Sequence, residues 1–364
     1  MSDENVGHSD RQIGTAADVE HQGRPSMKDE VRSSSPARKM RAAVDLRVIT
    51  PNEELVALGP EWLDLWRRSP SATPFQSPMW LLPWWRHFGS DELHVIEIRE
   101  RGRLEALAPL YILRDDSESL GLFIGTGMTD YLDVLASREQ CALIIDELTK
   151  ANCQVWDLQQ LRPNTPILET RTPSGWSDNI EDQDPCLVLS LQGLSLSTHF
   201  KKKLRYYTRS LEREGEVRFE EANAQNLDAM LESLFELHTA RWQRRGMSGM
   251  LGDDVVRAFH SEVARAMFDA GALRMNSMRA GDRVVAVFYG FADSSAVYYY
   301  LSGYDPDLEK LSPGMLIVAH AIECAVRDGA TTFDFLRGAE DYKYSWGAKD
   351  RLNRRRIMGS ELYL

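Results

Sequence analysis

The chain of 364 residues is 43% hydrophobic and 9% aromatic, so it can bury a sizeable core and is long enough for two domains. A formal net charge of −12 argues against a dedicated nucleic-acid-binding protein, and we predict no DNA partner. The sequence has neither an apolar run of about 18 residues nor a signal-peptide pattern at its N-terminus. We therefore expect a cytoplasmic protein without a membrane span.

The first predicted segments are a tail and two helices. Residues 1–43 are rich in charged and small polar residues and contain no aromatic residue, which predicts a disordered tail before a folded region that begins near Val44. Apolar residues at three-to-four-residue intervals predict a helix over 53–67. Ser77 and Pro78 mark the start of a second helix, which Pro83 interrupts or kinks.

The rest of the first half changes to a strand-like period of two. We expect a hairpin over 93–99 and 104–113, a strand over 131–135, a helix over 139–151, a strand over 155–158 and a linker or excursion over 164–185.

The second half repeats this order of elements. We expect a hairpin over 273–279 and 284–291, a strand over 296–303, a helix over 315–327 and a strand over 331–336. Ala106 aligns with Ala286 at a shift of 180 residues, and Asp157 aligns with Asp334 at a shift of 177. This nearly constant shift indicates an internal duplication, so we predict two α/β domains, over 44–190 and 191–364.

A polar loop leads into the segment where the helix of the second half begins, namely Ser312, Pro313, Gly314 and Met315. A helix start presents unpaired backbone N–H groups and a partial positive charge, which suits a phosphate, and Gly314 allows a close approach. The same pattern starts many helices that bind nothing, which is the alternative interpretation. We predict that these four residues bind a phosphate-bearing donor.

The strand that follows carries an acidic residue among apolar ones. Its alternation places Phe333 and Phe335 on one face and Asp334 on the other. A buried carboxylate needs a partner or a chemical task. One interpretation is an ion pair with Arg337 or Lys343; the other is that Asp334 orients a substrate amine or the basic loop that follows.

Three motifs of the second half, LSPGxL, FDFLRG and YKxxW, resemble the C-terminal half of the CelD/BcsL family of GNAT acetyltransferases, which is related to the Fem-type peptidyltransferases. The similarity extends over roughly Val44 to Leu364 and includes FQSPMW, GMTDYLDVL and LHTARWQRRG. The resemblance implies an α/β (α+β) fold of two tandem GNAT-like acyl-CoA N-acyltransferase domains, with mixed central sheets flanked by helices. It also implies an activated acyl or aminoacyl donor and an amine acceptor, often a cell-envelope or polysaccharide precursor.

The donor loop departs from the pattern of ordinary acetyl-CoA enzymes, because neither half contains a Q/R-x-x-G-x-G/A pyrophosphate loop. We expect acetyl-CoA or another acyl-CoA as co-substrate, with the acyl group left open. In the favoured mechanism, the acceptor amine attacks the donor carbonyl carbon after losing its proton. The predicted catalytic residues are Asp334, Tyr300, Tyr304 and Lys343, and the residues predicted to bind substrate nearby are Arg337, Tyr342 and Trp346.

Two other groups of residues carry alternatives. Basic residues that include Lys202 and Arg205 crowd the first turns of a helix that begins near residue 199. They form either a solvated face or a clamp for the phosphates of a nucleotide-linked acceptor or of a tRNA. His238, Arg241 and Trp242 share one face of a later helix and are either core residues or contacts of an anionic acceptor.

The remaining expectations concern metals and rival functions. Asp130, Tyr131 and Asp133 form an acidic set without His or Cys partners, so we predict no metal. The favoured acceptor is a small-molecule or nucleotide-linked amine. The alternatives are a Fem-like transfer from aminoacyl-tRNA, and a catalytically silent binding module of polysaccharide assembly.

Overall fold

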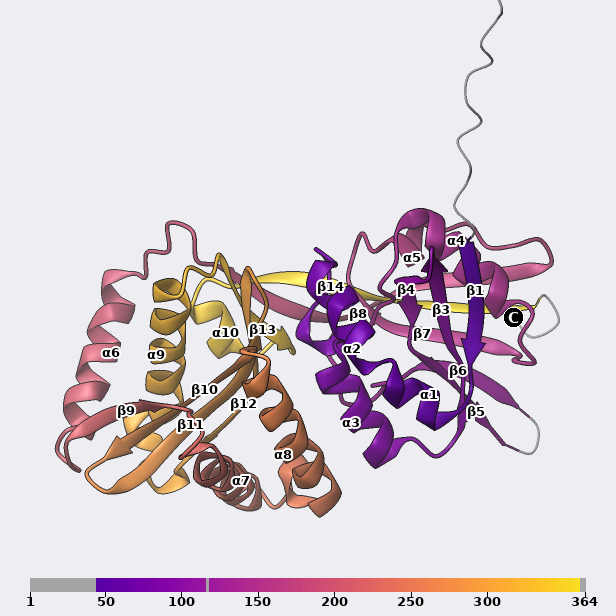
Figure 1. Ribbon diagram of the computed structural model, residues 1–364. Coiled ribbons are helices and arrows are strands. Elements are labelled where there is room, and N and C mark those ends of the chain that lie inside the picture. The colour runs from indigo at the N-terminus through magenta and orange to yellow at the C-terminus, as the bar shows by residue number, and fades with distance from the viewer. Residues whose placement is uncertain (1–43, 116–117, 361–364) are drawn as a thin grey trace, which may run out of the picture. The chain divides into compact units, whose positions relative to one another are not determined.

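The computed structural model describes residues 44–115 and 118–360 (Figure 1). The tail predicted over 1–43 lies outside the described residues. The first half contains helices α1 (Asn52–Ala57), α2 (Gly59–Arg68), α3 (Pro78–Phe88), α4 (Arg138–Leu148) and α5 (Pro166–Glu169), and a 3-10 turn η1 (Pro74–Gln76). Its strands are β1 (Val44–Ile49), β2 (Glu92–Leu93), β3 (Val95–Glu100), β4 (Arg103–Ala108), β5 (Leu110–Arg114), β6 (Ser119–Phe123), β7 (Val155–Leu161) and β8 (Trp176–Ser190).

The second half has the larger helices. They are α6 (Thr198–Leu211), α7 (Leu227–Gln243), α8 (Asp254–Asp269), α9 (Pro313–Arg327) and α10 (Asp341–Ser345), with the 3-10 turns η2 (Met250–Gly252) and η3 (Pro306–Leu311). Its strands are β9 (Val217–Glu221), β10 (Leu273–Ala280), β11 (Arg283–Ala292), β12 (Ala296–Tyr304), β13 (Thr332–Arg337) and β14 (Lys349–Ser360).

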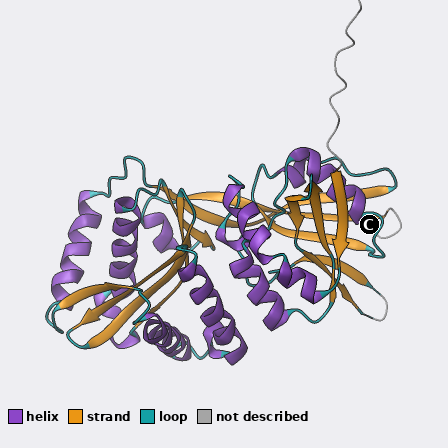
Figure 2. Ribbon diagram, viewed as in Figure 1, coloured by secondary structure: helices purple, strands orange, loops and turns teal. Residues whose placement is uncertain are grey.

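Strands from both halves form one 11-stranded sheet, in the order β2-β5-β6-β7-β14-β8-β13-β12-β11-β10-β9, and β1, β3 and β4 form a separate three-stranded sheet (Figure 2). The sheet is mixed, because β6 runs parallel to β7 and β12 parallel to β13, while its other pairs are antiparallel. The prediction of a mixed α/β fold flanked by helices is confirmed.

The two halves exchange strands. β8 follows β7 in the chain but pairs with β13, and β14 follows β13 but pairs with β7. β8 and β14 also pair with each other along most of their lengths. The described residues accordingly form one compact unit, and the domain boundary expected at residue 190 stays a prediction.

Two of the predicted elements are wrong. Residues 131–135 form no regular strand, because Leu132 N donates to Gln160 O and Leu135 makes only an isolated bridge to Leu107. The expected linker over 164–185 contains most of the 15-residue strand β8. Asp, Asn and Pro are rare in strands, so the local composition predicted a loop, and pairing with a distant strand overrides that preference.

Helices cover both faces of the sheet in the second half, and alternate residues of β11 point to opposite faces. Val287, Tyr289 and Phe291 belong to a core that α7 and α8 share with the first half, and Ala286 and Phe288 belong to a core under α9. α6 packs against α9 and η3, which places a second helix outside α9 (Figure 1). No helix among the described residues is long and apolar enough to cross a lipid bilayer.

Candidate active site

The two parallel strands of the second half part before they end. β12 and β13 pair at only three positions, and the last of these joins Tyr298 to Asp334. β12 continues to Tyr304 and β13 to Arg337, so the facing main-chain groups beyond this point have no sheet partner among the described residues. The carboxyl ends of parallel strands lie at one edge of a sheet, where ligands of α/β proteins bind. We call this place the strand opening.

Helix α9 begins at the same edge, because it follows β12 through η3. Its N-cap residue, Ser312, adopts a left-handed backbone conformation with φ of 52°, and its side chain accepts no hydrogen bond from the first turn. The equivalent helix of the first half, α4, is closed by a capping box in which Ser137 and Gln140 satisfy each other's backbone N–H groups. Of these two equivalent helix starts, the one beside the strand opening lacks a side-chain cap, and its Gly314 N–H has no hydrogen-bond partner among the described residues.

The predicted donor segment contacts two other predicted groups. A Cβ atom added at Gly314 would lie 3.0 Å from Cδ1 of Tyr304, so the glycine lets the Tyr304 ring pack on the helix start. The guanidinium carbon of Arg241 lies 5.0 Å from the centre of the Tyr304 ring, and Trp242 Nε1 donates to His238 Nε2 over 3.0 Å. The structure thus brings together β12, α7 and the start of α9.

His238 is a neutral side chain in this group. Burial first, and then Arg241, lowers its pKa to about 4. Because Trp242 donates to Nε2, the proton of the neutral ring is on Nδ1, which is buried without a hydrogen-bond partner among the described residues. These contacts fit a positioning role for His238 better than contact with an anion.

Sequence reasoning missed two polar side chains of β12 beside the opening. The hydroxyl of Tyr299 lies 2.5 Å from Ser302 Oγ. Desolvation, and next the neighbouring Tyr299, raises the pKa of Tyr342, a residue predicted to bind substrate. The sequence does not identify Tyr299 as a site residue, because its period-two pattern with Val297 and Leu301 is typical of a core strand.

The other predicted tyrosine points away from this group. Tyr300 donates from its hydroxyl to Met128 O of the first half over 2.9 Å, and its ring packs against Trp80 and His260. Its role near a leaving group stays a prediction.

Asp334 is held in a buried network instead of facing the opening. Its carboxylate accepts from the hydroxyl of Tyr131 at 2.9 and 3.1 Å, from Leu336 N at 2.9 Å and from Arg351 Nη2 at 2.6 Å. The ion-pair partner is Arg351 of β14, so the expected pairing with Arg337 or Lys343 is wrong. Burial raises the pKa of Asp334, and Arg351 opposes that rise. A structural role accounts for all these contacts.

The aligned aspartate of the first half makes the equivalent contact. Asp157 of β7 accepts from Nε and Nη2 of Arg355, at 2.6 and 2.9 Å. Each of the two duplicated aspartates therefore fastens β14 to its own half. A residue with positive φ lies shortly after each aspartate. Gln160, three residues after Asp157, has a φ of 55°, and Leu336, two residues after Asp334, has a φ of 59°. The shared geometry supports the duplication that the sequence indicated.

The basic residues at the end of β13 and just after it also form hydrogen bonds and ion pairs with neighbouring groups. Lys343 is only 3% exposed, and its ammonium group donates to Arg337 O at 2.7 Å and Gly338 O at 3.1 Å and pairs with Glu340 at 2.8 Å. Arg337 Nε lies 3.0 Å from an oxygen of Asp130. Lys343 thus holds the end of β13, and its predicted catalytic role stays a prediction.

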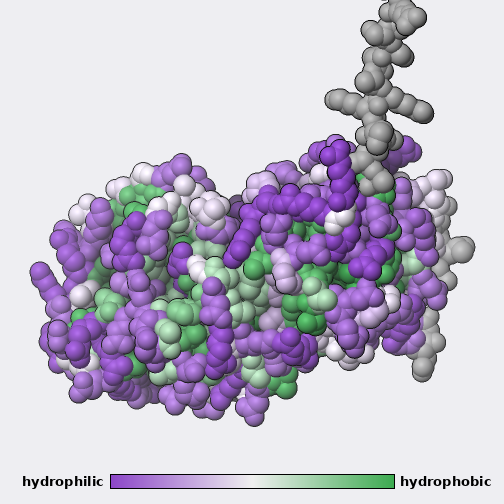
Figure 3. Space-filling model, in the orientation of Figure 1, coloured by the Kyte–Doolittle hydropathy of each residue, from purple (hydrophilic) through white to green (hydrophobic). Residues whose placement is uncertain are grey.

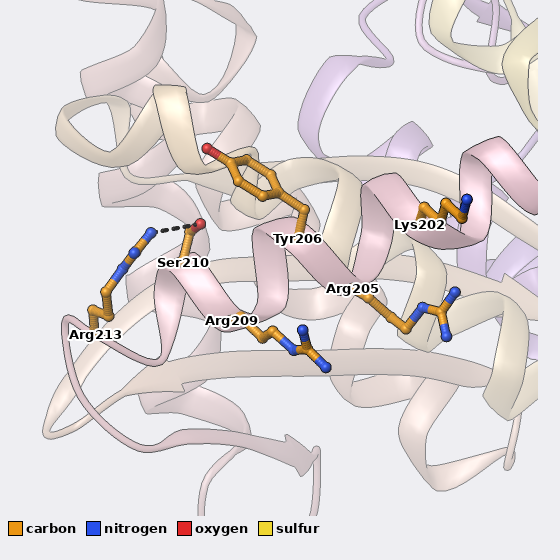
Figure 4. Close-up of a pocket in the computed structure, with 6 residues that line it drawn as sticks. All are labelled: Lys202, Arg205, Tyr206, Arg209, Ser210 and Arg213. Carbon is orange, nitrogen blue, oxygen red and sulfur yellow. Dashed lines mark hydrogen bonds between the residues drawn. The ribbon is translucent and has the colours of Figure 1, made fainter.

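The remaining predicted residues lie on or beside α6. Trp346 packs on Phe200 of that helix with ring centres 4.7 Å apart, so it is a core residue. Lys202 and Arg205 line a shallow surface hollow of about 440 Å³ together with Tyr206, Arg209 and Ser210 of α6 and Arg213 of the turn after it (Figure 4). Mostly hydrophilic side chains cover the face over this helix (Figure 3). Within the described part of the chain, no hydrogen bond, ion pair or ring contact joins this basic face to Tyr304 or Arg241.

Comparison with known proteins agrees with this geometry. Residues 198–344 match the family described as Acetyltransferase (GNAT) domain. A search of curated protein sequences finds no match. Among the described residues, no group of three or more acidic, His or Cys side chains is arranged to hold a metal ion.

Solved structures resemble nearly the whole chain at low identity. A crystal structure of FemX is 11% identical, covers 86% of this chain and 96% of its own, and gives a TM-score of 0.63. The C-terminal domain of a putative lysylphosphatidylglycerol synthetase from Agrobacterium fabrum is 12% identical, with coverages of 85% and 92% and a TM-score of 0.54. A protein of unknown function from Bacteroides thetaiotaomicron is 12% identical, with coverages of 87% and 100% and a TM-score of 0.56. The chain has a GNAT acyltransferase fold, and the family match lies in its second half.

Proposed function

We propose that the protein is an N-acyltransferase that moves an acyl group from an acyl-CoA-type donor to an amine. The acceptor would be a small molecule, a sugar or a precursor of the cell envelope or a polysaccharide, as in the CelD/BcsL family that the motifs resemble. One observation carries the proposal: the strand opening and the uncapped start of α9 lie at the same edge of the second half.

Two features of this edge fit an acyl-CoA. The main-chain groups of β12 that face the opening beyond Tyr298 suit an extended arm with its own amides, because such an arm adds to a strand edge through backbone hydrogen bonds. The uncapped start of α9 suits the pyrophosphate at the other end of that arm. Tyr304 and Arg241 flank this start and supply a ring face and a positive charge. The fold and the local groups therefore favour the same donor.

A valine at Gly314 tests this placement. Gly314→Val puts branched carbon atoms against the Tyr304 ring at the helix start where we place the donor pyrophosphate, so we expect acetyl-CoA to bind about tenfold or more weakly by calorimetry. Ser137→Ala is the matched control, because it removes the cap of α4 in the first half and costs about 1 kcal/mol of stability. The placement fails if a folded Gly314→Val protein binds acetyl-CoA as tightly as the control.

One feature favours the Fem-like alternative, in which the donor is an aminoacyl-tRNA. α6 and the turn after it carry six cations that form no ion pair with any described residue: Lys201, Lys202, Lys203, Arg205, Arg209 and Arg213. Arg205 and Arg209 project from the same side of the helix (Figure 4). In a protein of net charge −12, such a cluster suits a polyanion.

Replacing four of these cations distinguishes the two donors. If the alternative holds, a Lys202→Gln, Arg205→Gln, Arg209→Gln, Arg213→Gln protein should bind unfractionated tRNA at least tenfold more weakly, with a smaller salt dependence. Lys150→Gln, which removes an exposed lysine of the first half, is the control. Under the acyl-CoA proposal, neither variant changes acetyl-CoA affinity. A wild-type protein that binds acetyl-CoA and transfers its acyl group to no amine would instead favour the silent binding module.

A further inference from the structure

Two buried aspartates of one first-half loop, Asp130 and Asp133, and the buried Asp334 of β13 differ in how their oxygens are used. Both oxygens of Asp334 accept hydrogen bonds, and so do both oxygens of Asp133, from Val134 N at 2.8 Å and from the hydroxyl of Thr165 at 2.6 Å. Asp130 is held through Oδ1 by Arg337 alone. Its Oδ2 has no partner among the described residues, and its side chain keeps 13% exposure. Of the three, Asp130 is the carboxylate with an oxygen free to react.

Asp130 lies where the two strands have parted. It belongs to the loop of the first half that crosses this edge, because Met128 O accepts from Tyr300 of β12 and Asp130 pairs with Arg337 of β13. Both of these partners lie beyond the last paired position of their strands. Burial, and next the Asp130 carboxylate, raises the pKa of Tyr300, in agreement with this proximity. The loop therefore brings a carboxylate to the mouth of the strand opening.

We propose that Asp130 is the general base of the acyl transfer, a role that rests on the proposed function. Its free oxygen takes a proton from the acceptor ammonium group. The amine nitrogen then forms a bond to the acyl carbon, the carbon–sulfur bond of the thioester breaks, and the thiolate leaves as the thiol with the second proton of the nitrogen. Asp130 returns its proton to water. The first half thus supplies a catalytic group to a donor site built by the second half.

The surrounding charges suit this task. Burial raises the pKa of Asp130 to about 6, while Arg337 and Lys343 lower it and Asp334 raises it. These groups face Asp130 from β13 and α10, and Tyr300 faces it from β12. A base with a pKa near 6 is ionised at neutral pH and accepts a proton more readily than an ordinary aspartate. Turnover should therefore rise as the pH increases through about 6.

Chemical labelling tests the free oxygen without any assumption about the acceptor. Wild-type protein is treated with a water-soluble carbodiimide and glycine ethyl ester at pH 6, and the modified residues are found by peptide mass spectrometry. We expect Asp130 to be modified at least tenfold faster than Asp133 and Asp334, and acetyl-CoA to slow its modification. Equal modification of the three residues, or faster modification of Asp334, overturns the proposal.

Turnover then tests the catalytic role. Thiol release from acetyl-CoA is measured from pH 5 to 8 with glucosamine and putrescine as acceptors, for Asp130→Asn, Asp130→Glu and the matched control Asp133→Asn. Asp133 is a fair control because it lies in the same loop, is also buried and has a pKa raised to about 6, chiefly by burial. We expect Asp130→Asn to reduce kcat/KM by about 100-fold to 10,000-fold, Asp130→Glu to restore part of the rate, and Asp133→Asn to stay within about tenfold.

The two possible failures are distinguishable. If wild-type protein releases thiol and Asp130→Asn keeps its rate and its pH profile, the base is wrong and the proposed function stands. If wild-type protein neither binds acetyl-CoA nor releases thiol, the proposed function falls, and the acyl-transfer role of Asp130 falls with it. Calorimetry with acetyl-CoA and a melting curve for Asp130→Asn show whether that variant is folded, since a loss of fold would also remove donor binding.

Discussion

Asp334→Asn is expected to lower the free energy of unfolding by about 3 kcal/mol or more and to leave turnover within about tenfold of the wild-type rate. Removal of one partner of a buried ion pair leaves the other charge uncompensated, which typically costs about 3–5 kcal/mol. Asp334 is 2% exposed and Arg351 is 31% exposed, so water reaches the arginine and we expect the lower end of this range. Urea unfolding and a single-turnover rate on the same preparation measure both effects.

Asp157→Asn is the matched control for this variant. Asp157 fastens β14 to the first half as Asp334 fastens it to the second, so the two variants should lose similar stability. A catalytic Asp334 predicts the reverse pattern, with turnover reduced by about 100-fold to 10,000-fold in a protein of nearly normal stability. That outcome would return Asp334 to the reacting groups and remove the structural assignment.

A chain that ends before Lys349 is expected to lose cooperative folding in both halves. Such a chain lacks β14, whose pairing joins β7 to β8, and the buried ion pairs to Asp157 and Asp334. It also lacks Arg356, which is 1% exposed and bonded to Asp178 and Thr172. The combined loss exceeds the roughly 5–15 kcal/mol by which a typical domain is stable.

Circular dichroism and thermal melting measure this loss. Arg354→Gln is the control, since it removes a β14 pair whose two side chains are 40% and 54% exposed, and exposed pairs contribute about 1 kcal/mol or less. A synthetic peptide of residues 349–360, added to the shortened chain, should restore part of the helical signal. Normal melting of the shortened chain would show that the halves fold separately and that the strand exchange is dispensable.

Local sequence patterns predict most of the helices and strands of the second half. The hairpin of β10 and β11 consists of two apolar-rich segments joined through a glycine turn, and the start of α9 carries a proline in its first turn, so sequence patterns predict both within a few residues. The sequence does not predict the exchange of β8 and β14 between the halves, because β8 has the composition of a loop. Its signal is long-range: the acidic run DNIEDQD pairs with the basic run RLNRRR of β14, in opposite orientation.

The site was only partly predictable for the same reason. Tyr304, Gly314 and Arg241 were found from their place after a strand, at a helix start or on a helix face. The sequence identifies Asp130 only as part of an acidic set without metal-binding partners, because its partner Arg337 is more than two hundred residues away in the chain. The partner of Asp334 was missed because β14 was not expected to cross the sheet. Local patterns identify candidate residues, whereas the exchange of strands decides which of them meet.

Hydrogen–deuterium exchange with saturating acetyl-CoA tests most directly whether the second half holds the donor. The pyrophosphate and the amide-bearing arm of this molecule are common to all acyl-CoA donors, so the result does not depend on the natural acyl group. We predict slower exchange in residues 299–304, 312–318 and 335–338, which form the strand opening and the start of α9, and no change in residues 121–123 and 137–141 of the first half. Protection confined to the first-half segments, or unchanged exchange under conditions where calorimetry shows binding, would contradict the account.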